Sequence, residues 1–125
     1  MTQNPRIIIV DDEAPAREMV GDYLKMHGFN VTLCDGGKSL RGAIESSVPD
    51  LVVLDLNMPD MHGMEVIGFV RSHQAYRNIP IVVLTTKGEE TSRTEALAAG
   101  ANRYLTKPFD PRQLADVVGS LLQTN

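Results

Sequence analysis

The chain has 125 residues, 42% of them hydrophobic, which suits a single domain over residues 1–125 with a sizeable core. Its formal charge of -4 argues against nonspecific nucleic-acid binding, and no Lys/Arg cluster is long enough to follow a phosphate backbone. No apolar run approaches the roughly 18–20 residues that span a bilayer, and a signal segment is not recognised at the N-terminus. We therefore expect a soluble, cytoplasmic domain that binds neither nucleic acid nor a membrane directly.

The first half of the chain alternates strand and helix. Residues 6–10 are apolar and β-branched and predict a strand that ends in Asp11-Asp12. A helix follows, with Pro15 in its first turn and its end near Gly28. Residues 29–34 predict a second strand. It carries the single cysteine, Cys34, for which we expect a small buried thiol. A short helix begins after residues 36–37.

The second half repeats this alternation. Residues 51–54 form an apolar run that reads as a strand buried on both faces, and Asp55 stands where it leaves the sheet. Helices are predicted over residues 63–72 and 89–99. Strands are predicted over residues 81–84, where the strand ends at Thr85-Thr86, and over residues 102–106. Asp110 is a good N-cap for a last helix, which has Pro111 at its first position.

Five strands alternating with five helices imply an α/β doubly wound fold with a parallel five-stranded sheet and right-handed crossovers. We choose the flavodoxin-like strand order 2-1-3-4-5, whose switch point falls between strands one and three. Ligands of such folds bind at the carboxyl ends of the strands. The residues at those ends are Asp11, Asp12, Asp55, Thr85 and Lys107.

These residues predict a site that receives a phosphoryl group. In isolation Asp55 could merely cap the next helix, but three carboxylates at one edge repel one another. A hard divalent cation is the simplest remedy, and Mg²⁺ fits best, with Mn²⁺ as a substitute. The backbone carbonyl of Asn57 could complete its protein ligands. Lys107 supplies a compact positive charge and Thr85 a hydroxyl, two groups suited to hold phosphoryl oxygens.

The chain resembles the receiver domains of two-component response regulators, the CheY-like family, over essentially its whole length. The motifs that carry the resemblance are Asp11-Asp12, Asp55, Thr85 and Lys107-Pro108, with Tyr104 three residues before the lysine. The resemblance implies that Asp55 is the phosphoacceptor, that Asp11 and Asp12 help to hold Mg²⁺, and that Lys107 and Thr85 bind the phosphoryl group. It also implies a cis peptide before Pro108 and a rotameric switch at Tyr104, which composition alone leaves open as a plain core residue.

The same resemblance implies the reaction and the partners. A sensor histidine kinase or a histidine phosphotransfer protein would donate the phosphoryl group, and the domain would catalyse its own phosphorylation and dephosphorylation. The surface of the fourth helix, last strand and last helix would then change and act on a downstream effector. A homodimer through the fourth-helix face is compatible with the family, although no residue here compels it.

Two residues depart from the family's pattern. His62 stands where many relatives carry an acidic residue, and we expect it to be solvated. Thr86 is bulkier than the small residue usual after the threonine. We expect Thr86 and Lys87 to modulate the site. If the ammonium of Lys87 leans over the phosphoryl oxygens, Lys87→Ala should shorten the phosphorylated half-life. The alternative is that Lys87 is simply solvated.

Three other functions are weighed against this one. A haloacid-dehalogenase-type phosphatase needs a second acid two residues after its aspartate, where Asn57 stands. A flavodoxin-like FMN-binding module would place phosphate against Asp11-Asp12, which would repel it. A scaffold that works without phosphorylation would not need the complete acceptor set.

Overall fold

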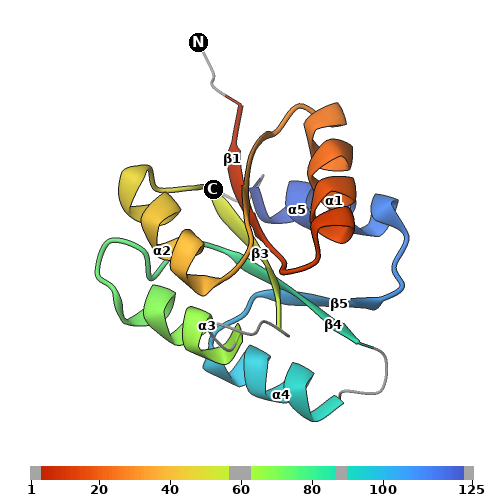
Figure 1. Cartoon of the computed structure of the whole chain (residues 1–125). Helices are drawn as coiled ribbons and strands as arrows, with labels where there is room; N and C mark the ends of the chain where they lie inside the picture. Colours follow the sequence, from red (N-terminus) through yellow and green to blue (C-terminus); the bar gives the residue numbers. More distant parts are fainter. Residues whose placement is uncertain (1–3, 57–62, 87–89, 123–125) are drawn as a thin grey trace.

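The computed structural model describes residues 4–56, 63–86 and 90–122, which contain all ten predicted elements in the predicted order (Figure 1). The strands are β1 (Arg6–Val10), β2 (Asn30–Cys34), β3 (Leu51–Asp55), β4 (Ile81–Thr86) and β5 (Arg103–Lys107). The helices are α1 (Ala14–Met26), α2 (Gly37–Ser46), α3 (Gly63–Ser72), α4 (Glu90–Ala99) and α5 (Pro111–Leu122). The second and fifth strands each begin one residue later than predicted. None of the helices in these ranges is long and apolar enough to cross a membrane.

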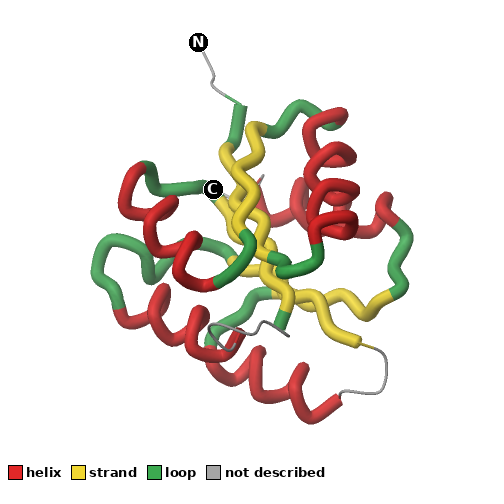
Figure 2. The backbone as a smooth tube through the Cα atoms, viewed as in Figure 1, coloured by secondary structure: helices red, strands yellow, loops and turns green. Residues whose placement is uncertain are grey.

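The five strands form one parallel sheet in the order β2-β1-β3-β4-β5, as predicted. Helices cover both of its faces (Figures 1 and 2). Side chains on one face pack with α1 and α5, and those on the other with α2, α3 and α4. This two-sided cover explains why every residue of β3 is buried and why its sequence is a continuous apolar run.

Successive side chains of a strand point to opposite faces of the sheet, so the residues at the carboxyl ends of the strands lie on one face or the other. Asp55 follows the alternation of Leu51 and Val53, which pack on the α1–α5 side of the sheet. Thr85 follows Ile81 and Val83, and Val83 packs on the α2–α4 side. The site is therefore built from both faces of the sheet, where they meet at its edge.

Gly63 brings the start of α3 against the end of β3. Its N–H donates to the carbonyl of Leu56 at 3.3 Å. A Cβ atom at this position would lie 2.7 Å from the Cα of Leu56, a backbone atom that cannot turn aside. Only glycine allows this approach, so Gly63 fixes where the chain returns to the edge beside the site.

Arg71 joins three elements at the opposite end of the sheet. Its guanidinium donates to the carbonyls of Gly100 at 3.0 Å and Ile79 at 2.7 Å, and to Oδ1 of Asn102 at 2.9 Å. The same Oδ1 accepts the N–H of Ile81 at 2.8 Å. These bonds tie the end of α3 to the starts of β4 and β5, and the sequence analysis did not identify them.

The ends of the last two helices agree with their sequence signals. Gly100, just past the end of α4, has φ +124, a backbone conformation that side-chain-bearing residues rarely adopt. Oδ1 of Asp110 accepts the N–H of Arg112 at 2.9 Å, which is the bond expected of an N-cap. Both predicted helix boundaries are thus confirmed.

Candidate functional site

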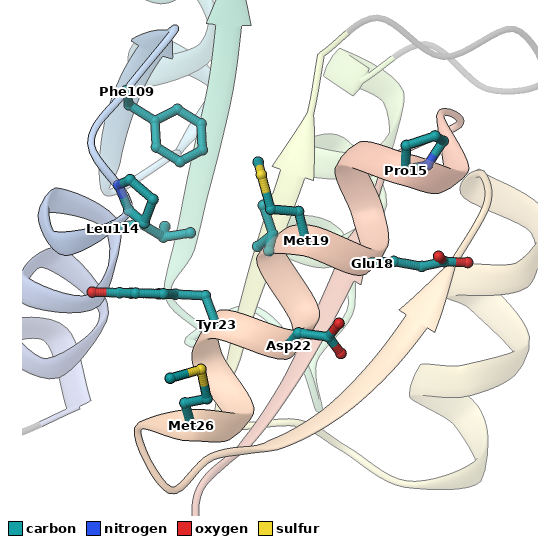
Figure 3. Close-up of a pocket in the computed structure, with 10 residues that line it drawn as sticks. Pro15, Glu18, Met19, Asp22, Tyr23, Met26, Phe109 and Leu114 are labelled. Carbon is teal, nitrogen blue, oxygen red and sulfur yellow. The ribbon is translucent and has the colours of Figure 1, made fainter.

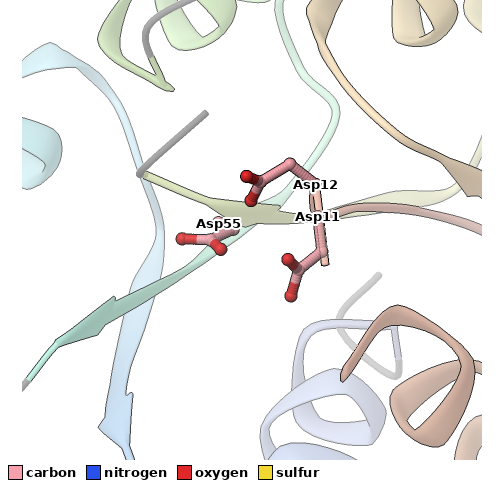
Figure 4. Close-up of side chains that lie close together, drawn as sticks. All are labelled: Asp11, Asp12 and Asp55. Carbon is pink, nitrogen blue, oxygen red and sulfur yellow. The ribbon is translucent and has the colours of Figure 1, made fainter. Parts of the chain in front are cut away.

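Three carboxylates gather where β1 and β3 reach the edge of the sheet (Figure 4). Asp11 and Asp12 follow β1, and Asp55 ends β3, so the pairing of these two strands brings them together. One oxygen from each residue lies within 4.8 Å of the others. Asp11 and Asp55 are buried, whereas Asp12 is exposed at the mouth of the site.

Hydrogen bonds fix Asp11 on three sides. Its N–H donates to the carbonyl of Cys34 at 3.1 Å, and its Oδ1 accepts the N–H of Glu13 at 3.0 Å. Its own carbonyl accepts a bond from Nη1 of Arg17 at 2.8 Å. Burial raises the pKa of Asp11, and the charge of Asp55 adds to the rise, while the Glu13 bond and Lys107 oppose it. Burial is thus the main reason that the charged form of this carboxylate is disfavoured.

Lys107, at the end of β5, supplies part of that charge. Its Nζ donates to Oδ2 of Asp55 at 3.1 Å and lies 3.8 Å from Oδ2 of Asp11. Burial by itself lowers the pKa of Lys107, but the carboxylates of Asp55 and Asp11 outweigh it and the net pKa is raised. The side chain is therefore an ammonium that bridges two strands.

Thr85 adds an unused hydroxyl. Its side chain is fully buried, and among the described residues its Oγ1 has no hydrogen-bond partner. A buried hydroxyl without a partner costs free energy, so it is retained where a ligand can pair with it. A phosphoryl oxygen at Asp55, the acceptor that the family resemblance implies, would be such a ligand.

The residues present fit a hard divalent cation. Among the described residues, three carboxylates and the ammonium of Lys107 leave excess negative charge in a partly buried space, and the carboxylate donors are oxygens, the ligands that Mg²⁺ prefers. Asn57, predicted to add a backbone carbonyl, lies outside the described residues, as do His62, Lys87 and the side chain of Thr86. Their predicted roles stay predictions.

Tyr104, the predicted switch, lies on β5 with 41% of its surface exposed. It is not a core residue here, and Arg93 of α4 lies over its ring. The peptide bond between Lys107 and Pro108 is cis, as the family resemblance implied.

An apolar hollow of about 560 Å³ lies between α1 and α5, and Figure 3 shows Met19, Tyr23 and Phe109 turned into it. A smaller hollow of about 210 Å³ shares Met19 and Phe109 with it and reaches Asp11 and Lys107. The two hollows thus form an apolar surface that extends from Asp11 along α1. The sequence analysis missed it, because Met19 and Met26 are visible in the sequence but only the structure shows that they are exposed.

Comparison with known proteins agrees with the fold. The response regulator receiver domain family matches residues 7–119. The phosphate regulon transcriptional regulatory protein PhoB of Pseudomonas aeruginosa is 38% identical over 117 residues, covering 94% of this chain and 51% of PhoB. The transcriptional regulatory protein ResD of Bacillus subtilis is 36% identical, covering 98% of this chain and 50% of ResD. The chain therefore spans about half the length of these two relatives.

Solved structures give the same answer. The chemotaxis protein CheY4 of Vibrio cholerae is 31% identical with a TM-score of 0.89, covering 95% of this chain and 99% of that one. The receiver domain of NtrX from Brucella abortus is 26% identical with a TM-score of 0.89 and the same coverage. These matches favour neither the phosphatase nor the FMN-binding alternative. The chain belongs to the response regulator receiver domain family.

Proposed function

We propose that Asp55 is the phosphoacceptor of this domain and that Asp11, Asp12, Thr85 and Lys107 serve its reaction. The observation that carries this proposal is the grouping of three carboxylates, two of which lie within 3.8 Å of the Lys107 ammonium, beside a buried hydroxyl that has no partner in the described chain. A carboxylate held in place by a neighbouring ammonium needs no general base to act as a nucleophile.

The reaction is an in-line phosphoryl transfer. One oxygen of Asp55 attacks the phosphorus of a phosphohistidine, the P–N bond breaks, and the imidazole nitrogen leaves with the electron pair. An acyl phosphate results. The ammonium of Lys107, now released from Oδ2 of Asp55, pairs with one phosphoryl oxygen, and the hydroxyl of Thr85 donates to another. Attack of water on the same phosphorus later returns the free carboxylate and orthophosphate.

Asp11, Asp12 and Asp55, with the carbonyl of Asn57, would hold Mg²⁺ or, as a substitute, Mn²⁺. When bound, the cation neutralises charge on the transferring group and the acceptor. The roles of Asn57 as a ligand, and of Thr86 and Lys87 as modulators of the phosphorylated lifetime, are inferred from their positions in the sequence close to Asp55 and Thr85.

The donor is a sensor histidine kinase or a histidine phosphotransfer protein. A protein that brings a phosphohistidine to Asp55 must also contact the neighbouring surface, where the two apolar hollows share Met19 and Phe109. We place the donor's docking surface there. Glu18 and Asp22 point away from α5 in Figure 3 and would pair with basic residues of the donor at the edge of this docking surface.

The output is a change in the surface of α4, β5 and α5, read by a downstream effector or by a second copy of the chain. Movement of Thr85 toward the phosphoryl group would open space on the α4 side, into which Tyr104 rotates. Relatives of this chain are named transcriptional regulators, which act where the chromosome lies, so we assign the domain to the cytoplasm.

Incubation with acetyl phosphate and Mg²⁺ tests this function. We expect the intact mass to gain one phosphoryl group, and the gain to be lost with hydroxylamine, with a chelator and in Asp55→Asn. Labelling that persists in Asp55→Asn would move the acceptor elsewhere. No labelling of the wild-type chain by any small phosphodonor or by a phosphorylated kinase would reject the function.

A further inference from the structure

Arg93, on the first half of α4, contacts two side chains of β5. Its guanidinium carbon lies 5.1 Å from the centre of the Tyr104 ring, and its Nη1 donates to Oγ1 of Thr106 at 3.2 Å. Tyr104 and Thr106 are alternate residues of one strand, so they point to the same face of the sheet, the face that α4 covers. One planar guanidinium thus serves a ring and a hydroxyl together.

This contact lies next to the phosphoryl site. Thr85 of β4 pairs in register with Thr106 of β5, and Val83 pairs with Tyr104. Register partners in a parallel sheet project to the same face, so the side chain of Thr106 is a neighbour of Thr85 and also accepts the bond from Arg93. A movement of Thr85 therefore takes place within one strand spacing of the residue that holds Arg93.

The two contacts favour the exposed position of Tyr104. A guanidinium over an exposed tyrosine ring shifts an equilibrium between ring positions by about two- to five-fold. The bond to Thr106 fixes the guanidinium on β5 and reduces the entropy lost when it lies against the ring. To rotate toward Thr85, the ring must leave the guanidinium.

We propose that Arg93 is a positioning residue that holds Tyr104 in its exposed orientation and so sets how much of the active conformation exists before phosphorylation. This inference rests on the proposed function, because it assumes that Tyr104 turns inward when Asp55 is phosphorylated. The inference adds that Arg93 opposes this inward rotation of Tyr104. Phosphorylation must overcome the Arg93 contact, and loss of the contact must favour the inward ring without any phosphoryl group.

Fluorine NMR of the chain labelled with 3-fluorotyrosine reads the ring directly. The chain has three tyrosines, and Tyr104→Phe identifies which of the three signals belongs to Tyr104. Beryllofluoride with Mg²⁺ serves as the phosphoryl mimic. The Tyr104 signal is recorded with and without the mimic for wild type, Arg93→Ala, Arg93→Lys and Arg103→Ala.

Arg103→Ala is the matched control. It removes the same charge from the exposed start of β5, but the guanidinium of Arg103 bonds the carbonyl of Asn102 at 2.9 Å rather than the tyrosine. A lysine at position 93 keeps the charge but lacks the planar fork that serves both partners.

We expect the unphosphorylated Arg93→Ala signal to lie part of the way toward the wild-type signal with beryllofluoride, reflecting a several-fold increase in the inward population. Arg93→Lys should fall between the two, and Arg103→Ala should match wild type. A wild-type signal that moves with beryllofluoride, together with an Arg93→Ala signal that stays at the wild-type resting position, would reject the role of Arg93 alone. A shift of equal size in Arg103→Ala would assign the effect to charge and also reject it. A wild-type signal that ignores bound beryllofluoride would reject the switch role of Tyr104, and the inference with it.

Discussion

The ammonium of Lys107 bonds the carboxylate of Asp55 at 3.1 Å across the sheet, although the two residues are 52 positions apart in sequence. They end β5 and β3, which flank β4, and both project to the α1–α5 side. In the resting protein the group that we propose to bind the phosphoryl oxygens is thus held by the proposed acceptor itself. On this proposal, transfer of the phosphoryl group exchanges one anionic partner of the ammonium for another.

Lys107→Ala should therefore affect both stability and phosphorylation. Without Mg²⁺ the free energy of unfolding should fall by about 1 kcal/mol, because buried carboxylates lose a charged partner that is itself partly exposed. Labelling by acetyl phosphate should slow by roughly tenfold or more, the cost of losing one charge-assisted contact to the transferring group. Chemical unfolding and labelling rates measure the two effects. Lys25→Ala, which removes the same charge at the end of α1, should change neither.

Asp12→Ala should separate Mg²⁺ binding from folding. The carboxylate of Asp12 is exposed and lies close to two buried ones, so its removal relieves like-charge repulsion while it deletes a proposed metal ligand. We expect Mg²⁺ affinity to fall roughly tenfold, or about 1.4 kcal/mol. Without metal the melting temperature should stay the same or rise. Titration with Mg²⁺ and thermal unfolding decide the matter, and an unchanged Mg²⁺ affinity would remove Asp12 from the ligand set.

Two glycines of α3 should respond in opposite ways to alanine. At Gly63 a Cβ would meet the backbone of Leu56 at 2.7 Å, so Gly63→Ala should destabilise the fold by about 2 kcal/mol. At Gly68 nothing described lies within 4 Å of the added Cβ, so Gly68→Ala should stabilise the helix by about 0.5–1 kcal/mol. Urea unfolding of the two variants tests the pair. Equal effects would show that the approach of Gly63 to Leu56 does not constrain the chain.

Alkaline pH should destabilise the protein partly through Cys34. Burial, with the charge of Asp35, raises the pKa of its thiol from 9.0 to about 11, so the folded state favours the neutral thiol. Stability from this group is complete below pH 9 and is lost as pH rises toward 11, by roughly 2–3 kcal/mol in all. Lys107, whose pKa is also raised, acts in the same direction. Unfolding measured between pH 8 and pH 11 should show a flatter decline in Cys34→Ala, and parallel declines would contradict the assignment.

The sequence contained most of the fold because its signals are local. Apolar runs of β-branched residues mark the strands, and Asp110 and Gly100 mark helix ends that the structure confirms. Once the strand order is chosen, the meeting of Asp11, Asp55 and Lys107 follows from topology, since parallel strands carry their ends to one edge.

What could not be predicted depends on side chains meeting across elements. Arg71 reads as an ordinary exposed helix residue, yet it bonds backbone carbonyls that only the fold brings near it. The contact of Arg93 with Tyr104 likewise needs the packing of α4 on β5. Periodicity gives the face of each element but not which long side chain reaches which partner. Tyr104 shows the limit, because composition alone leaves open whether it is a plain core residue, and the structure exposes it.

Reduction of the phosphorylated protein with borohydride tests the central claim most directly. Borohydride converts an aspartyl phosphate to homoserine and leaves free carboxylates unchanged, so peptide mass spectrometry then reports the acceptor by position. We predict homoserine at position 55 after treatment with acetyl phosphate and Mg²⁺, and aspartate at positions 11 and 12. Homoserine at 11 or 12, or at no aspartate of a chain that has gained a phosphoryl group, would contradict the account.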